Sequence, residues 1–234
     1  MRRAIDATDD LSISHDAIAS AEARGESPLW LEILADGMTF DLCGIAPGPA
    51  ARGPALAAGP HLRNRYEAPP DFTDTSAEAL SLAPGPHLRG GQSTIPVVRA
   101  QAALGARLVR QFPSVEAVAW TPARTLVGRG VFLSTVEVWL AGGPFPALGL
   151  TAFRQTMGGA LESEGLAFFT GQELHFEHGA LPDPVAATRL GVRLVNELVG
   201  RAPLSARTEF AGPDGAAVVI EPSRNGRFLR VGRD

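Results

Sequence analysis

The sequence predicts an α+β protein in which helices pack on one face of a mixed, mainly antiparallel sheet. Short segments that alternate apolar and polar residues are separated by turn dipeptides such as Asp36-Gly37, which is typical of hairpins. Two longer segments, 95–112 and 184–200, repeat apolar residues every three or four positions, as amphipathic helices do. Strands and helices do not alternate strictly along the chain, and this disfavours a doubly wound parallel sheet.

Composition favours one globular domain over residues 1–234. Hydrophobic residues make up 45% and charged residues 20% of the chain, a balance typical of folded rather than disordered proteins. The single cysteine, Cys43, excludes an intrachain disulfide and a cysteine-based zinc site. The sequence shows no secretory signal and no apolar run of about 20 residues, so we expect a cytoplasmic protein without membrane association.

The basic residues are unusual because all 21 are arginine and none is lysine. This excludes a Schiff-base lysine, a lysine general base and the lysine of a P-loop. Any recognition of anions must therefore use guanidinium groups. The net charge of −4 and the dispersed arginines argue against a nucleic-acid partner, for which clustered positive charge is expected.

An N-terminal hairpin region occupies residues 1–43. It begins with a short helix predicted over 16–24, with Ser14 as its N-cap. Strands follow at 29–34 and 38–43, and the turn between them returns the chain as a hairpin.

Residues 44–91 form a Pro/Gly-rich irregular segment between this hairpin region and the main body at 92–234. A structureless loop of this length is uncommon in a compact domain, so we expect either short strands near Leu56 and at 79–82 or a segment that wraps the surface of the domain.

An internal repeat lies within the irregular segment. Leu56–Arg63 recurs as Leu82–Arg89, with seven of eight positions identical. Two copies are too few for a solenoid. The repeat is either one turn geometry used twice or chance similarity in a stretch rich in Gly, Pro and Ala.

The main body has the most regular patterns. One helix over 95–112 begins after Thr94 as its N-cap and ends before Pro113. Another begins after the N-cap Asp183 and ends at Gly200. The other predicted elements are a strand at 115–120, a buried helix at 131–140, strands at 148–155, 166–170 and 172–177, and a closing hairpin of 216–221 with 228–231.

The run Gly165–Gly171, the following Glu173–Glu177, a helix that starts with proline and the closing hairpin resemble the C-terminal part of the DUF4261 group. The strand–helix–strand order over 115–155 is similar too, so the resemblance covers roughly residues 95–234. This group consists of bacterial proteins whose name records an unknown function. The resemblance implies a bacterial origin and supports the α+β fold, and it carries no catalytic residues to this chain.

The segment with the clearest metal-ligand chemistry follows Gln172. On a strand, alternate side chains share a face, so two carboxylates and one imidazole would project together, with a second imidazole at the strand end. Such a set suits Zn, Mn or Fe. The predicted metal ligands are Glu173, His175, Glu177 and His178. The alternative is that a half-buried strand simply carries polar residues on its outer face.

A second candidate site lies just before the helix at 95–112. Glycines at a helix N-terminus let backbone N–H groups converge on an anion, and a nearby histidine and arginine would add charge. The predicted anion-binding residues are His87, Arg89, Gly90, Gly91, Ser93 and Thr94. The alternative is an ordinary capped helix after a flexible turn.

Other patterns are weaker. No Gly-x-Ser-x-Gly elbow is present, so a serine hydrolase is disfavoured and no catalytic residue is predicted. Arg124 and Arg129 flank the start of the buried helix and form either an anion clamp or an ordinary turn. Trp120 and Trp139 would mark a partner surface if both were exposed, and are otherwise core residues.

Taken as a whole, these patterns favour a non-catalytic binding or interaction module. The alternative is a small-anion or metal-binding protein, including a metal-dependent enzyme. The expected partner is accordingly a protein or a small anionic ligand. The sequence assigns neither a cofactor nor an oligomeric state.

Overall fold

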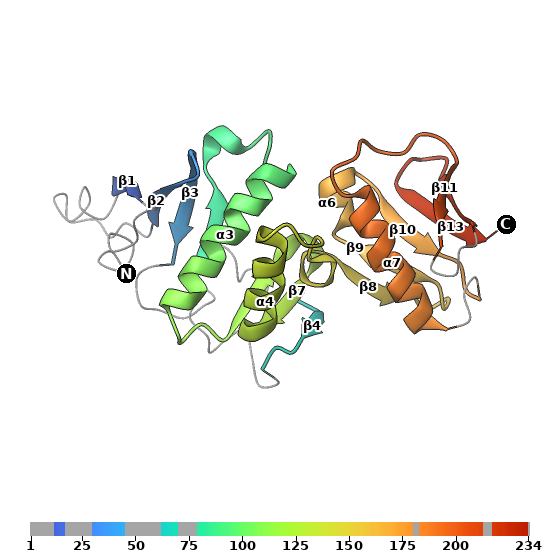
Figure 1. The fold of residues 1–234 in the computed structure, drawn as a ribbon, viewed down its shortest axis with the longest axis horizontal. Coiled ribbons are helices and arrows are strands. Elements are labelled where there is room, and N and C mark those ends of the chain that lie inside the picture. Colours follow the sequence, from blue (N-terminus) through green and yellow to red (C-terminus); the bar gives the residue numbers. More distant parts are fainter. Residues whose placement is uncertain are drawn as a thin grey trace.

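The strands divide among three sheets in the computed structural model (Figure 1). The structure describes residues 12–16, 30–44, 62–69, 79–179, 183–212 and 217–233. Helices combined with several mainly antiparallel sheets confirm the predicted α+β class. Within the described ranges, no helix is both long and apolar enough to cross a membrane.

The first sheet has four antiparallel strands in the order β1-β2-β3-β5. They are β1 (Ser12–Asp16), β2 (Trp30–Ala35), β3 (Met38–Cys43) and β5 (Ser81–Pro84). The predicted hairpin is confirmed, because Trp30 pairs with Cys43 and both Asp36 and Gly37 have positive φ in the turn. Ser14 lies inside β1, so its assignment as a helix N-cap is wrong.

Parts of the sequence predictions lie outside the described residues. Residues 17–24 of the predicted helix and the strand expected near Leu56 are among them. Residues 56–61, most of the first copy of the repeat, also lie outside the described residues, so the two copies cannot be compared.

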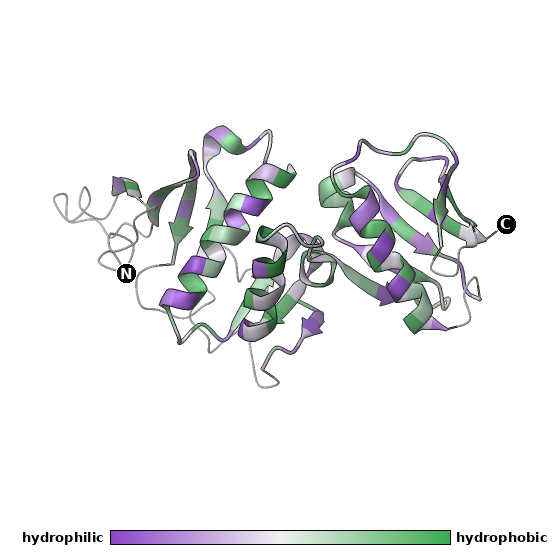
Figure 2. Cartoon of the chain, viewed as in Figure 1, coloured by the Kyte–Doolittle hydropathy of each residue, from purple (hydrophilic) through white to green (hydrophobic). Residues whose placement is uncertain are grey.

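Helix α3 (Ile95–Gln111) packs on the four-stranded sheet and lies between that sheet and α4 (Figure 1). Leu104 and Leu108 from the helix meet Ile33 and Phe40 from the sheet in one buried cluster. Figure 2 shows hydrophobic and hydrophilic residues interleaved along α3, the pattern of a helix with one buried face. The predicted helix and its N-cap position at Thr94 are confirmed.

The second sheet is three-stranded, in the order β4-β7-β6. Its strands are β4 (Asn64–Tyr66), β7 (Thr125–Gly128) and β6 (Ala117–Trp120), and short 3-10 turns η3 (Pro86–Leu88) and η4 (Thr121–Ala123) precede α3 and β7. Helices α4 (Arg129–Leu140) and α5 (Ala147–Leu150) pack against it. The helix predicted at 131–140 is present as α4, but it is only partly buried: it buries the stripe of Phe132, Val136 and Trp139, whereas Val138 is 52% exposed.

The third sheet has six strands in the order β11-β12-β13-β10-β9-β8, antiparallel except where β10 pairs with β13. They are β8 (Ala152–Gln155), β9 (Leu161–Glu164), β10 (Glu173–Phe176), β11 (Thr208–Ala211), β12 (Ala217–Pro222) and β13 (Phe228–Arg233). Helix α7 (Pro184–Leu198) buries Leu190 and Leu194 in the core that this sheet shares with α3 and α4. Asp183 caps α7 as predicted, since its carboxylate accepts a hydrogen bond from the Ala186 N–H.

Two predicted strands differ in the structure. The segment at 166–170 is a helix, α6 (Leu166–Thr170), flanked by Gly165 and Gly171 with φ of +93° and +78°. These left-handed positions favour glycine, and they separate the helical turn from β9 before it and from β10 after it. The segment at 148–155 divides into a helical turn, α5, and the shorter strand β8.

Candidate functional site

The four predicted metal ligands lie on β10 and just beyond it, with the expected alternation. Leu174 and Phe176 are buried, whereas Glu173 and His175 point to the other face. The structure nevertheless gives each of the four a different environment.

The Glu173 carboxylate caps helix α6. Its Oε1 accepts hydrogen bonds from the N–H groups of Gly165 at 2.8 Å and Ala167 at 3.0 Å. Its Oε2 accepts from the Leu166 N–H at 3.2 Å and from the Ser163 hydroxyl at 2.5 Å. Burial raises the pKa of this carboxyl group, and these four hydrogen bonds act in the opposite direction. The Glu173 carboxylate therefore satisfies the free N–H groups of the first turn of α6.

The histidines contact other groups. His175 Nδ1 lies 3.1 Å from Glu162 Oε1, and the same carboxylate pairs with Arg154 at 3.3 Å. His178 Nδ1 lies 3.4 Å from the carbonyl oxygen of Gly159, and Glu177 is exposed. Among the described residues, no three His, Cys, Asp or Glu side chains are placed to share a metal ion. Metal binding thus stays a prediction from the sequence.

The predicted anion-binding residues lie on η3 and the turn that leads into α3. Arg89 and Gly90 are exposed, Ser93 is half-buried, and the Thr94 hydroxyl donates to the Gly91 carbonyl at 2.7 Å. The structure gives Thr94 no capping bond from its side chain to the helix. These residues form a hydrogen-bonded turn, and anion binding stays a prediction.

A carboxylate lies beside the predicted anion site. His87 Nδ1 is 3.2 Å from the Thr39 hydroxyl, and its charge acts on Asp41 of the same sheet. Burial and the neighbouring Glu32 raise the pKa of Asp41, whereas His87 lowers it. Negative charge at this position works against the binding of an anion by His87.

Of the two alternatives for Arg124 and Arg129, the structure does not support an anion clamp, because the two side chains contact different groups. Arg129 donates to the backbone carbonyls of Phe112 and Val115, at 2.9 and 3.3 Å, and so joins α4 to the end of α3. Arg124 points instead toward Glu164, with Nε 3.5 Å from Oε1.

Glu164 is the centre of a charged cluster at the junction of β4, η4 and β9. Arg63 donates to both of its oxygens, at 2.6 and 3.1 Å, and the Asn64 amide donates at 2.8 Å. Burial raises the pKa of Glu164, but these hydrogen bonds and the charges of Arg63 and Arg124 outweigh it and hold the pKa below its usual value. Two guanidinium groups thus share one carboxylate, which leaves one positive charge in excess.

A small apolar hollow lies between the three-stranded sheet and helices α4 and α5. Its volume is about 30 Å³. Its walls are Val118, Trp120, Val127, Phe132, Thr135, Val136, Pro146, Leu148, Gly149 and Leu150. The Trp120 Nε1 is buried and has no hydrogen-bond acceptor within the described part of the chain. Leu148, also on the wall, is 40% exposed.

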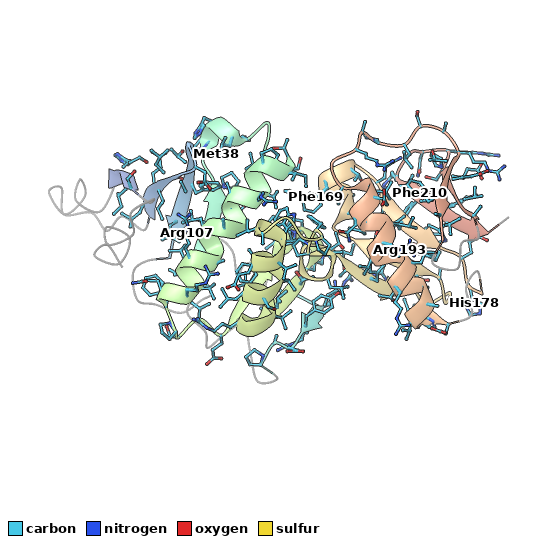
Figure 3. The ribbon with its side chains drawn as sticks, in the orientation of Figure 1. Met38, Arg107, Phe169, His178, Arg193 and Phe210 are labelled. Atoms are coloured by element: carbon cyan, nitrogen blue, oxygen red, sulfur yellow. The ribbon has the colours of Figure 1, made fainter. Side chains whose placement is uncertain are left out.

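Trp120 also belongs to a cluster of aromatic rings. It meets Phe168 edge-to-face at 5.5 Å and stacks with Phe169 at 6.5 Å between ring centres. Phe169, labelled in Figure 3 where α6 faces the α3–α4 part of the molecule, continues the contacts through Phe145 to Trp139. Trp139 is only 5% exposed, so the two tryptophans are not exposed together. Trp120, Phe168 and Phe169 are half-buried.

These features define an α+β protein with a small apolar hollow that has Trp120 in its wall, and with a charged cluster in which Arg63 and Arg124 share Glu164. No protein-family model, curated protein or solved structure matches the chain. The resemblance to the DUF4261 group therefore stays a prediction.

Proposed function

We propose that the protein is a non-catalytic binding module that recognises another protein through the hollow beside Trp120. The observation that carries this proposal is the unpartnered indole N–H of Trp120. Buried donors in folded proteins are nearly always hydrogen-bonded, and leaving one unpaired costs about 1–3 kcal/mol. A partner that displaces the side chains covering this N–H and brings an acceptor to it recovers that free energy.

The size of the hollow supports a side chain as its occupant. A cavity must offer at least about 10–15 Å³ to hold one water molecule, so about 30 Å³ accommodates only a few atoms. This suits the end of an aliphatic side chain better than a metabolite. The half-buried rings of Phe168 and Phe169 next to Trp120 supply the aromatic surface that often dominates binding energy at protein interfaces.

The ionisable groups also support binding over catalysis. Glu162 is shared by His175 and Arg154, and Glu164 is engaged by two arginines and an amide. Binding of a small anion or a metal ion is the runner-up function. The buried Asp41 Oδ1 also lacks a hydrogen-bond partner among the described residues, but Asp41 lies on the first sheet and interacts with Glu32 and His87, away from the predicted metal ligands of β10. We extend the proposal to a cytoplasmic partner, following the expectation from the sequence.

Site-specific photo-cross-linking in the native host tests this function. A photoreactive residue at Leu148 is expected to capture a discrete partner, and the same residue at Met157, a fully exposed apolar position on the β8–β9 turn, is expected not to. Trp120→Phe removes the N–H and keeps a ring, so it should abolish the Leu148 adduct. An adduct pattern that is identical at the two positions, or unchanged in the Trp120→Phe variant, would refute the proposal.

A further inference from the structure

Two contacts join the segment β9–α6 to the segment β6–η4. One is the charged cluster, since Glu164 is the last residue of β9 and Arg124 directly follows η4. The other is aromatic, since Phe168 and Phe169 of α6 contact the ring of Trp120, the last residue of β6. On both segments the two contacts are only a few residues apart. Loss of the charged contact should therefore loosen the aromatic one.

The backbone at the start of α6 lies directly on η4. A Cβ on Gly165 would come within 2.6 Å of the Ala123 Cβ and 2.8 Å of the Ala123 Cα. The Asn64 amide joins the two segments as well, because it donates to the Ala123 carbonyl and to Glu164 Oε2, both at 2.8 Å. In the described part of the chain, no hydrogen bond joins α6 itself to β6 or η4. The polar attachment of the two segments thus rests on the Glu164 cluster.

The aromatic contact holds the Trp120 site closed. Trp120 Nε1 is buried without an acceptor, so a partner reaches it only after side chains that cover it have moved. Phe168 and Phe169 both contact the Trp120 ring, and both are half-buried. Helix α6 has a separate anchor in the core, because Leu166 is fully buried. The two rings can therefore leave Trp120 while α6 stays attached through Leu166.

The charged contact is partly open to solvent. The side chains of Arg63 and Arg124 are 45% and 46% exposed, whereas that of Glu164 is 15% exposed. Salt screens the attraction between exposed charges and does not screen apolar contacts. Rising ionic strength should thus weaken the attachment at Glu164 selectively.

We propose, resting on the function proposed above, that Phe168 and Phe169 are an autoinhibitory cover over Trp120 and that the Glu164 cluster is the latch that keeps this cover closed. The arrangement described above is the closed state. In the open state the two rings leave Trp120, and its N–H becomes accessible. The partner binds the open state, so its apparent dissociation constant is the intrinsic one divided by the open fraction. The latch thereby regulates affinity without touching the partner.

Solvent exchange of the Trp120 indole N–H measures the opening without any partner. The chain has three tryptophans, so a nitrogen-15-labelled sample gives three indole signals, and the one lost in Trp120→Phe is assigned to Trp120. Glu164→Gln keeps the size of the side chain and removes its charge, and it should accelerate exchange of this N–H at least about tenfold by favouring local opening. Phe168→Leu removes one ring of the cover and should accelerate exchange as well.

Glu162→Gln is the matched control. Glu162 lies two residues earlier on β9, is 19% exposed and pairs with Arg154 and His175 instead, so its loss should leave Trp120 exchange unchanged. Raising the NaCl concentration from about 0.05 M to about 1 M should accelerate exchange in the wild type but not in Glu164→Gln. Urea unfolding of each variant separates this local opening from a loss of overall stability.

The two proposals fail in different ways. Unchanged Trp120 exchange in both Glu164→Gln and Phe168→Leu would overturn the cover, and equal acceleration by Glu164→Gln and Glu162→Gln would overturn the latch. The Leu148 adduct can persist in either case, and the proposed function would then stand without this regulation. If exchange responds as expected but the wild type gives no Leu148 adduct, the proposed function is overturned instead. With both intact, Glu164→Gln should raise the yield of the adduct, and a lower yield would overturn the latch.

Discussion

Replacing Glu173 with alanine is the most direct test of the structural role of this carboxylate. The sequence suggests a metal ligand, whereas the structure shows a cap for helix α6. The two interpretations differ in what the substitution does to stability without any metal, so one variant separates them.

The expected loss follows from the four hydrogen bonds that the carboxylate accepts. Hydrogen bonds to a charged group contribute about 1.5–3 kcal/mol each, but bonds that share one acceptor are not additive. Water can replace Glu173 at some of the donors once the side chain is gone. We therefore expect the free energy of unfolding to fall by about 3–4 kcal/mol, in the range for breaking a buried charged network.

Urea unfolding followed by far-UV circular dichroism measures this loss. Glu177→Ala is the matched control, because Glu177 is exposed just after the same strand, and it should change stability by less than about 0.5 kcal/mol. Both variants are also measured with and without added zinc. A loss below about 1 kcal/mol for Glu173→Ala, together with zinc stabilisation that both variants abolish, would refute the capping role and restore the metal site.

Two further predictions concern the same part of the fold. The pKa of Glu164 is held below its ordinary value of 4.5, so the ionised group stabilises the protein above pH 4.5, and this stabilisation is lost as the pH falls through the lowered pKa. The Glu164→Gln variant should thus be less stable than the wild type at neutral pH and should lose stability less steeply in acid. Parallel curves of stability against pH, measured by urea unfolding, would contradict this. In thermal unfolding, Gly165→Ala should destabilise the protein more than Gly142→Ala does. Both glycines have φ near +94°, but only at Gly165 would the new Cβ lie 2.6 Å from the Ala123 Cβ. Equal losses would show that backbone strain alone accounts for the effect.

Elements with local signals were predictable from the sequence. Asp183 and Pro184 mark the start of α7 through capping and a fixed φ, and Asp36-Gly37 marks the first hairpin, so both elements are as expected. These signals act within a few residues and need no tertiary partner.

Helix α6 shows why other elements were not predictable. The apolar run Leu166–Thr170 suits a strand or a helix equally well, because it is too short for its period to decide. Glu173 favours the helix, because its carboxylate accepts hydrogen bonds from three successive backbone N–H groups after the chain has turned back at Gly171. A polar residue on the strand's outer face was the only sign of this in the sequence, and it also suited a metal ligand.

The hollow could not have been predicted for a similar reason. Its walls come from β6, β7, α4 and α5, whose side chains meet only when the sheet and both helices are assembled. Trp120 alone was notable in the sequence, and nothing local indicates that its indole N–H lacks an acceptor.

The position of β13 in the six-stranded sheet has a consequence for synthesis on the ribosome. β13 is the last strand in the sequence, yet it lies between β12 and β10 and joins the β11–β12 hairpin to β10-β9-β8. Until Phe228–Arg233 has left the exit tunnel, the β11–β12 hairpin and the β8–β9–β10 strands form two partial sheets, each with an unpaired edge where β13 will later bind. Chaperone engagement should therefore persist until β13 has emerged, and premature termination shortly before Phe228 should yield an aggregating product rather than a shortened folded one.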